Sequence, residues 1–253
     1  MPDLPTPVAL ITGASAGLGE EFARQLAATG HRLVLVARRK ARLDALAAEL
    51  GNARAVEMDL SQTGATALLM ANIAKHDETV ELLVNNAGFG LSGRFEALEG
   101  LRQREMIDLN CGALTELAHA VLPAMIARGA GGILNVASTA AFQPGPGMAV
   151  YFATKGFVLS FSEALHDEAK GHGVKVSCLC PGPTRTEFRS VSGFAPKGPI
   201  GKISADAGSV VAAGLKGLDR NRAVVVPGLS NKIISQAHRL FPRAVMRRAA
   251  RMR

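Results

Sequence analysis

Long apolar runs are absent from this chain of 253 residues. A transmembrane helix needs a run of about 18 or more apolar residues, and the sequence contains none of that length. Residues 1–7 have neither a basic start nor an apolar core, so they do not fit a signal peptide. We therefore expect a cytoplasmic protein.

Cysteine and clustered histidine are also scarce. Cys178 and Cys180 are two positions apart on a predicted buried strand, a spacing that favours neither a metal site nor an easily formed disulfide. Cys111 falls in a helical stretch, and because free cysteine is usually buried we expect three core thiols. The six histidines show no ligand spacing, so we expect no metal.

Short apolar runs alternate with longer helical patterns along the whole chain, without a low-complexity segment that would mark a linker. Strands are predicted at 8–12, 32–36, 54–58, 80–84, 133–137, 174–179 and 223–226. Helices are predicted up to residue 28 and over 40–50, 61–75, 98–127, 149–170 and 204–218. This pattern predicts an α/β fold, a single domain over residues 1–253 with one doubly wound parallel sheet (a Rossmann fold) and helices on both faces.

The net charge of +8 is concentrated at the C-terminal end. From Arg220 onward there are nine Lys or Arg and no acid, which leaves 20 basic against 21 acidic groups in residues 1–219. The extension 228–253 mixes apolar and basic residues, and Pro242 should kink or break any helix there. Three interpretations stay open: a contact with protein or a cover over the active cleft, contact with an anionic membrane surface, or a solvated tail. No recognition-helix pattern supports nucleic acid as a partner.

The segment from Ser138 to Lys155 carries the strongest chemical signal. Ser138 follows a predicted strand, so its hydroxyl should lie at the carboxyl end, where ligands of open α/β sheets bind. Tyr151 and Lys155 are four positions apart on a predicted helix and therefore share one face. An ammonium close to a phenol lowers the phenol pKa from about 10, which would make Tyr151 a general acid or base near neutral pH. A bare Tyr-x3-Lys pair is more often a core tyrosine beside a solvated lysine.

A glycine-rich turn over residues 12–19 follows the first strand and opens a helix, as a dinucleotide-binding turn does. Gly13 permits the tight turn, whereas Gly17 and Gly19 would let the backbone approach a pyrophosphate over the helix N-terminus. We assign Ser15 and Leu18 to the same cofactor-binding turn.

These motifs resemble the short-chain dehydrogenase/reductase family over residues 8–227. The resemblance rests on the glycine-rich turn, Asn85-Asn86-Ala87-Gly88, Asn110, Ser138, Tyr151 with Lys155, and Pro181-Gly182, in the family's order. It implies a catalytic set of Asn110, Ser138, Tyr151 and Lys155, in which Asn110 holds a water that relays protons toward Lys155, and Lys155 also binds the nicotinamide ribose. It further implies a homodimer or homotetramer built from the long helices, where Ala153, Gly156 and Ser160 permit close packing.

The resemblance also implies contacts with the cofactor beyond the glycine-rich turn. Asp59 and Leu60 resemble the pair that contacts adenine, although Asp59 could equally cap the helix predicted over 61–75. Asn86, Ala87 and Gly88 would close over the cofactor. The loop with Pro181, Gly182, Thr184 and Thr186 would meet the nicotinamide carboxamide.

The second predicted strand is followed by Arg38 and Arg39, where the adenosine ribose of a cofactor would lie. An enzyme that binds NAD usually has a carboxylate here for the ribose 2′-hydroxyl, whereas a 2′-phosphate needs a cation. The acid is missing and a base is present, which predicts NADP(H) bound by Arg38 and Arg39. The alternative is that both arginines belong to the solvated start of the next helix, and Ala16 stands where many NADP-preferring members have a second basic residue.

Residues 187–202 are rich in Gly, Pro and Ser and are predicted to form a lid. Apolar side chains gather in this lid and near the active serine and tyrosine: Phe142, Met148, Phe152, Phe188, Val191, Phe194 and Ile200. They suggest a lipophilic carbonyl substrate, although lids that only exclude water have similar residues.

The sequence therefore predicts an NADPH-dependent carbonyl reductase, or an alcohol dehydrogenase in the reverse direction, that acts on a small-molecule ketone or secondary alcohol. Two rival hypotheses stay open. One is a non-catalytic NADPH-binding regulator on the same fold. The other is a lipid- or steroid-type reductase that associates with a membrane surface through its basic tail.

Overall fold

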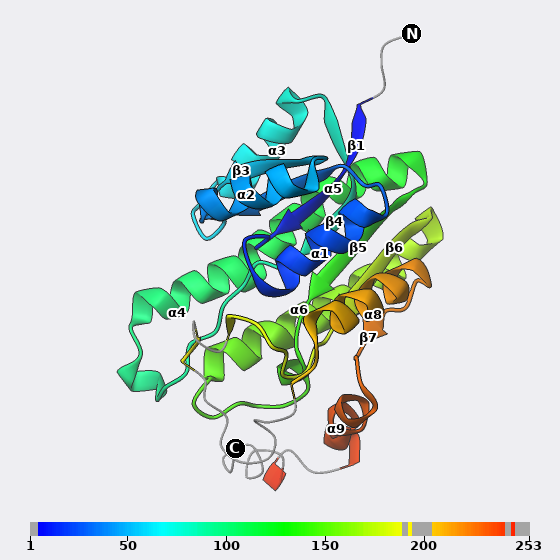
Figure 1. Ribbon diagram of the computed structural model, residues 1–253. Coiled ribbons are helices and arrows are strands. Elements are labelled where there is room, and N and C mark those ends of the chain that lie inside the picture. The colour runs from blue at the N-terminus through cyan, green and yellow to red at the C-terminus, as the bar shows by residue number, and fades with distance from the viewer. Residues whose placement is uncertain (1–4, 189–191, 194–203, 241–243, 246–253) are drawn as a thin grey trace.

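The computed structural model describes residues 5–188, 192–193, 204–240 and 244–245. Within them, seven strands form one parallel sheet in the order β3-β2-β1-β4-β5-β6-β7 (Figure 1). The strands are β1 (Thr6–Thr12), β2 (Leu33–Ala37), β3 (Ala53–Glu57), β4 (Glu78–Asn85), β5 (Gly131–Val136), β6 (Val174–Leu179) and β7 (Val224–Val225). The predicted parallel, doubly wound sheet is confirmed.

Helices cover both faces of this sheet, as predicted (Figure 1). One face packs against α3 (Ala65–Lys75), α5 (Leu114–Arg128) and α6 (Ala149–Ala169). The other face packs against α1 (Gly17–Ala28), α2 (Lys40–Leu50) and α8 (Ala207–Asp219). The remaining helical segments are α4 (Gly100–Ile107), α9 (Leu229–Leu240), the π-turn η2 (Asp108–Ala113), and the short η1 (Phe95–Ala97), η3 (Thr139–Phe142) and η4 (Lys170–His172).

The central strands are buried on both faces, which explains their nearly continuous apolar sequences. Val8, Leu10 and Leu83 belong to one apolar cluster, whereas Ile11 and Val84 belong to the other. The strand order reverses between β1 and β4, because the chain runs outward to β3 and then returns beside β1. A parallel sheet places its ligand crevice at such a point, beyond the carboxyl ends of the strands.

Two predicted helices differ in the structure. The helix predicted from Ser61 begins at Ala65, because Asp59 Oδ1 instead accepts hydrogen bonds from the Ser61 N–H at 3.0 Å and the Ser61 hydroxyl at 2.7 Å. Gly64, with φ of 79°, then reverses the chain before the helix. Asp59 therefore stabilises a turn rather than capping α3. The long helix predicted over 98–127 is interrupted by η2, which the apolar periodicity did not indicate.

The helical segment 100–128 is long and apolar enough, by length and composition alone, to cross a membrane. Its fully buried side chains Leu117, Val121 and Met125 belong to the cluster that covers the sheet. A core helix of a globular domain has the same composition, so packing against the sheet accounts for its apolar residues.

The three cysteines are free. Cys178 and Cys180 are buried, with their sulfur atoms 3.7 Å apart, whereas Cys111 is only half-buried. The predicted core position is therefore confirmed for the β6 pair and is wrong for Cys111, which lies in η2 at the edge of the core.

The C-terminal extension and the predicted lid are only partly described. Helix α9 begins the extension, with Leu229 and Ile233 exposed, while Pro242 lies outside the described residues. Most of the lid predicted over 187–202 also lies outside them, including Val191, Phe194 and Ile200.

Candidate functional site

A cleft of about 580 Å³ lies at the carboxyl ends of the strands. All the predicted site residues except Gly19 and Asn110 line it. Residues from the ends of β1, β2, β4, β5 and β6 meet there because parallel strands all end at the same edge of the sheet. The predicted cofactor and catalytic residues are thus brought together in one place.

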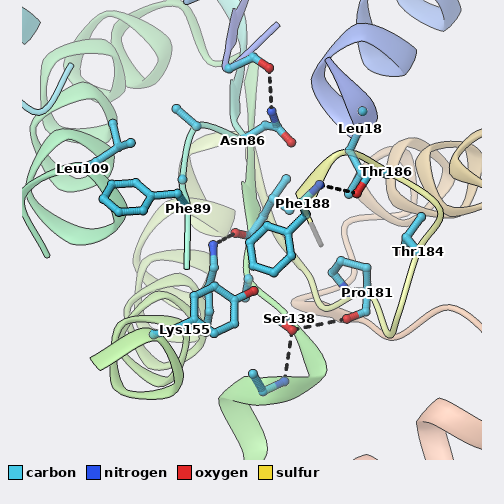
Figure 2. Close-up of a pocket in the computed structure, with 18 of the residues that line it drawn as sticks. Leu18, Asn86, Phe89, Leu109, Ser138, Lys155, Pro181, Thr184, Thr186 and Phe188 are labelled. Atoms are coloured by element: carbon cyan, nitrogen blue, oxygen red, sulfur yellow. Dashed lines mark hydrogen bonds between the residues drawn. The ribbon is translucent and has the colours of Figure 1, made fainter. Parts of the chain in front are cut away.

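The catalytic end of the cleft holds Ser138, Tyr151 and Lys155. Ser138 follows β5, and its Oγ accepts a hydrogen bond from the Ala140 N–H at 3.1 Å (Figure 2). Tyr151 and Lys155 are both buried on the same side of α6, as their spacing predicted. Lys155 Nζ donates to the Val136 carbonyl at 2.8 Å, and the Tyr151 phenol lies close enough to Ser138 for the serine side chain to affect its pKa. The serine and the phenol can therefore both reach one substrate oxygen.

Burial controls the protonation of this pair. It raises the pKa of Tyr151 to about 12, and the nearby Ser138 side chain only partly opposes that rise. Burial also lowers the pKa of Lys155 to about 8. The expected lowering of the tyrosine pKa by Lys155 is therefore wrong for the protein alone. The ammonium bonds to Val136 and lies 5.9 Å from the centre of the phenol ring, and the phenol itself is buried beside Phe188.

The protein contains a single tyrosine and no tryptophan, so the phenolate absorbance of Tyr151 can be followed without background. An exposed phenol is half ionised near pH ~10. We expect Tyr151 to show little phenolate absorbance at that pH, because its pKa is raised to about 12, and to ionise only at higher pH. A spectrophotometric titration of the cofactor-free protein, with circular dichroism to monitor folding, measures this. A midpoint near pH ~10 in folded protein would contradict the effect of burial.

Asn110 is buried in η2 and does not line the cleft. Its Oδ1 accepts from the Phe89 N–H at 3.1 Å, and its Nδ2 donates to the Phe89 carbonyl and to Thr154 Oγ1, each at 3.0 Å. Thr154 lies between Tyr151 and Lys155 on α6, so this amide joins the loop after β4 to the catalytic helix. The π-turn that carries Asn110 is a feature that is common at functional sites. Its implied role in holding a water stays a prediction.

The three glycines of the glycine-rich turn have different structural roles. Gly13 has φ of 67°, which confirms the predicted tight turn. Gly17 has φ of 59°, and a Cβ on it would lie 3.1 Å from Thr186 Cβ on the opposite wall of the cleft. A Cβ on Gly19 would overlap the Gly13 carbonyl oxygen and lie 2.6 Å from Asn86 Nδ2. Gly19 therefore permits α1 to pack against the turn, and its predicted direct role at the pyrophosphate is not what the geometry shows.

We expect Gly19→Ala to lower the free energy of unfolding by about 1–3 kcal/mol, because the new methyl group must displace backbone. Chemical denaturation measures the loss as a shift in the midpoint. Gly112→Ala is the matched control, since Gly112 is also helical and a Cβ on it would meet nothing within 4 Å. Equal stability of the two variants would refute this assignment for Gly19.

Both predicted arginines, Arg38 and Arg39, line the cleft next to the end of β2. We call this part the adenosine end, because the sequence predicts that the cofactor's adenosine ribose lies there. Arg38 Nη1 lies 3.8 Å from Asp59 Oδ2, and the Arg38 side chain is 58 % exposed. Arg39 is held more firmly, because its Nε donates to Ser15 Oγ at 3.1 Å. Arg38 is thus the more accessible cation, and Arg39 is tied to the glycine-rich turn.

Helix α9 supplies two cleft residues that the sequence did not predict, Asn231 and Ile234. A Cβ on Gly182 would lie 2.5 Å from the Asn231 amide, and Asn231 Nδ2 donates to the Pro227 carbonyl at 2.8 Å. The end of the loop after β6 is therefore shaped by the C-terminal extension. The only local sequence signal is the glycine at 228 just before the helix, which does not reveal a contact with residue 182.

The chain is similar to known proteins over most of its length. Residues 7–193 match the short chain dehydrogenase family. The chain belongs to this family. It is 39 % identical over 187 residues to the NADP-dependent 3-hydroxy acid dehydrogenase YdfG of Salmonella typhi, which covers 73 % of this chain and 75 % of the relative. It is 36 % identical over 184 residues to the serine 3-dehydrogenase of Agrobacterium fabrum, which covers 72 % of this chain and 74 % of the relative.

Two solved structures are similar to more of the chain than the family match covers. A short-chain dehydrogenase from Sphingobium yanoikuyae in complex with NADPH has a TM-score of 0.82 and 37 % identity, over 92 % of this chain and 94 % of the other. The bulky-bulky ketone specific alcohol dehydrogenase from Comamonas testosteroni has a TM-score of 0.78 and 34 % identity, over 93 % of both chains. The protein is thus an oxidoreductase of the short-chain dehydrogenase family, as the resemblance implied.

Proposed function

We propose that this short-chain dehydrogenase is an NADP(H)-dependent carbonyl reductase that acts on a lipophilic ketone or, in reverse, on the matching secondary alcohol. The observation that carries the proposal is the buried Tyr151 phenol beside Ser138, in the same cleft as Arg38 and Arg39. A catalytic acid and a binding site for a 2′-phosphate are then parts of one pocket. The names of relatives that use NADP or bind NADPH support the choice of cofactor.

The residues present fit such a cofactor. Gly13 and Gly17 line the cleft at the N-terminus of α1, where backbone N–H groups and the helix dipole favour a pyrophosphate. Arg38 and Arg39 would hold the 2′-phosphate as charge-assisted donors. Lys155 would hold the nicotinamide ribose.

The chemistry then follows from the protonation of the site. NADPH supplies the hydride when it is bound. Ser138 would donate a hydrogen bond to the substrate carbonyl oxygen, and Tyr151 would transfer its proton to the same oxygen as negative charge develops there. A phenol whose pKa is about 12 stays protonated at neutral pH, so it is ready to act as the acid in the reductive direction. Asn110 would keep α6 in place through Thr154.

The lining of the catalytic end favours a lipophilic substrate over a hydroxy acid. Met148, Phe152 and Phe188 surround Tyr151. Of the charged side chains that line the cleft in the described part of the chain, Lys155 is the one at this end, and it is already bonded to Val136. Among the described residues, a substrate carboxylate would find no dedicated cation, and leaving a charge unpaired in an apolar site is costly.

Paired substrates test this function. NADPH oxidation is measured with ketones of increasing chain length and ring number, and with a 3-oxo ester beside the free 3-oxo acid of the same carbon skeleton. We expect the ester to be reduced with a kcat/KM at least about tenfold higher than the acid, because the acid buries an unpaired charge. Preference for the free acid would overturn the lipophilic assignment. NADPH binding without turnover of any carbonyl would instead favour the non-catalytic regulator.

We also propose that two copies associate through α4 and α6. Large apolar side chains are exposed on these helices, with exposed fractions of 73 % for Leu101, 42 % for Ile107 and 44 % for Phe157. Neighbouring Ala153 and Ser160 on α6 are exposed and small, which allows another helix to approach closely.

We expect light scattering to give a dimer or tetramer at micromolar concentration and Phe157→Glu to shift it toward monomer, since a charge would be buried in the contact. Leu68→Glu is the control, because Leu68 is 66 % exposed on α3. A wild-type protein that is only monomeric would rule this association out.

A further inference from the structure

Three consecutive residues after β6, Thr186 to Phe188, reach three different parts of the cleft. Thr186 lies over Gly17 in the glycine-rich turn. The Phe188 ring lies 5.3 Å from the Tyr151 ring, and its N–H donates to Thr186 Oγ1 (Figure 2). The residue between them, Glu187, bonds to Arg39, which lines the adenosine end, and to Arg42. One short segment thus links the cofactor end to the catalytic end.

The Glu187 carboxylate is shared between two arginines of the α2 region. Arg39 Nη1 donates to one carboxylate oxygen at 2.8 Å, and Arg42 Nη1 donates to the other at 2.7 Å. The Arg39 guanidinium also donates to Ser15, to the hydroxyl at 3.1 Å and the carbonyl at 3.3 Å. These hydrogen bonds from the arginines lower the pKa of Glu187, so the carboxylate stays ionised at neutral pH.

The side chains of Arg39, Arg42 and Glu187 are each about half exposed, at 45 %, 52 % and 44 %. Exposed ion pairs are weak, so a doubly charged phosphate that enters the cleft can exchange with the carboxylate. The Glu187 carboxylate therefore pairs with Arg39, the cation that a ribose 2′-phosphate would use.

We infer that Glu187 is a specificity-determining residue, which competes with the 2′-phosphate of NADP(H) for Arg39. This inference rests on the proposed NADP(H) function. Glu187 weakens binding of the phosphorylated cofactor while leaving NADH binding unchanged, because NADH has no group that needs Arg39. The selectivity for NADPH is then smaller than Arg38 and Arg39 alone would give.

Binding measurements on Glu187→Gln test the competition without relying on turnover. NADPH and NADH are titrated against the protein, and nicotinamide fluorescence is followed, which the absence of tryptophan leaves clear. We expect the NADPH Kd to fall about three- to tenfold, as removal of a partly exposed charge allows, and the NADH Kd to change less than about twofold. Glu187→Asp, which keeps the charge on a shorter side chain, should lie between wild type and Glu187→Gln, and thermal unfolding confirms that both variants fold.

Glu57→Gln is the charge-matched control. Glu57 lies at the end of β3 near Lys40, whereas the carboxylate partner of Arg39 is Glu187. We expect this control to leave both Kd values within about twofold of wild type, since an exposed charge in water contributes little. Any of three results would overturn the inference. Glu187→Gln could change the Kd values of NADPH and NADH equally, it could bind NADPH more weakly, or Glu57→Gln could tighten NADPH binding by the same factor. Wild-type protein that binds neither cofactor would instead overturn the proposed function itself.

Discussion

We expect Tyr151→Phe to lower kcat at least about 10³-fold while the Kd for NADPH stays within about twofold. The variant loses the proton donor but keeps the ring. That ring packs 5.3 Å from Phe188 and 6.1 Å from Phe152, between centroids, so phenylalanine can occupy the same space. The loss therefore falls on the chemical step. Single-turnover NADPH oxidation, together with a separate cofactor titration, measures the two effects.

Misfolding of Tyr151→Phe must be excluded as the cause of a lower kcat. Removing the phenol hydroxyl takes away its polar interaction with Ser138, which should cost no more than about 1 kcal/mol of stability and is measured by chemical denaturation. Phe152→Leu is a suitable control, because it changes an aromatic neighbour of Tyr151 without removing the acid. Turnover in folded Tyr151→Phe at a tenth of the wild-type rate or more would sink the assignment of Tyr151 as the proton donor.

The sheet and the cleft could be predicted because their signals are local. The central parallel strands contain short apolar runs, since both of their faces are buried, and they deliver polar or glycine motifs at their carboxyl ends. Ser138, Tyr151 and Lys155 follow from this rule together with the four-residue helical spacing. The predicted start of α3 at Ser61 was wrong because the Asp59 side chain stabilises a turn. The sequence did not distinguish the two, since aspartate is also favoured at a helix start.

Other features depend on contacts between distant parts of the chain. Glu187 bonds to Arg39, which lies 148 positions earlier in the sequence. Asn231 of α9 packs against Gly182 in the loop after β6. Nothing in the sequence indicates that either pair of residues is in contact. The tyrosine pKa is a similar case, because the helical spacing indicates the nearby lysine but not the depth at which both side chains are buried. Desolvation of the phenol raises its pKa, and this effect outweighs the lowering that the nearby Lys155 ammonium was expected to cause.

We expect Arg38→Asp to reduce the preference for NADPH over NADH by about a hundredfold or more in kcat/KM. Arg38 lies directly after β2, lines the adenosine end and is 58 % exposed, so it can turn toward a phosphate. The aspartate would repel the 2′-phosphate, and Asp59 beside it would add to the repulsion once its arginine is gone. The same aspartate could accept a hydrogen bond from the ribose 2′-hydroxyl of NADH.

Two further variants separate loss of attraction from added repulsion. Arg38→Gln removes the cation alone and should reduce the preference by only about tenfold, the value of one exposed charge-assisted contact. Lys170→Asp makes the same change in net charge beyond the far end of α6, at the amino-terminal side of β6, and should leave the preference unchanged. Steady-state kinetics with both cofactors at fixed ionic strength measures all three variants. If the wild type already uses NADH as well as NADPH, the prediction of NADP(H) preference from Arg38 and Arg39 is wrong. If Arg38→Asp instead changes both cofactors equally, Arg38 does not bind the 2′-phosphate, and the NADP(H) assignment would depend on Arg39 alone.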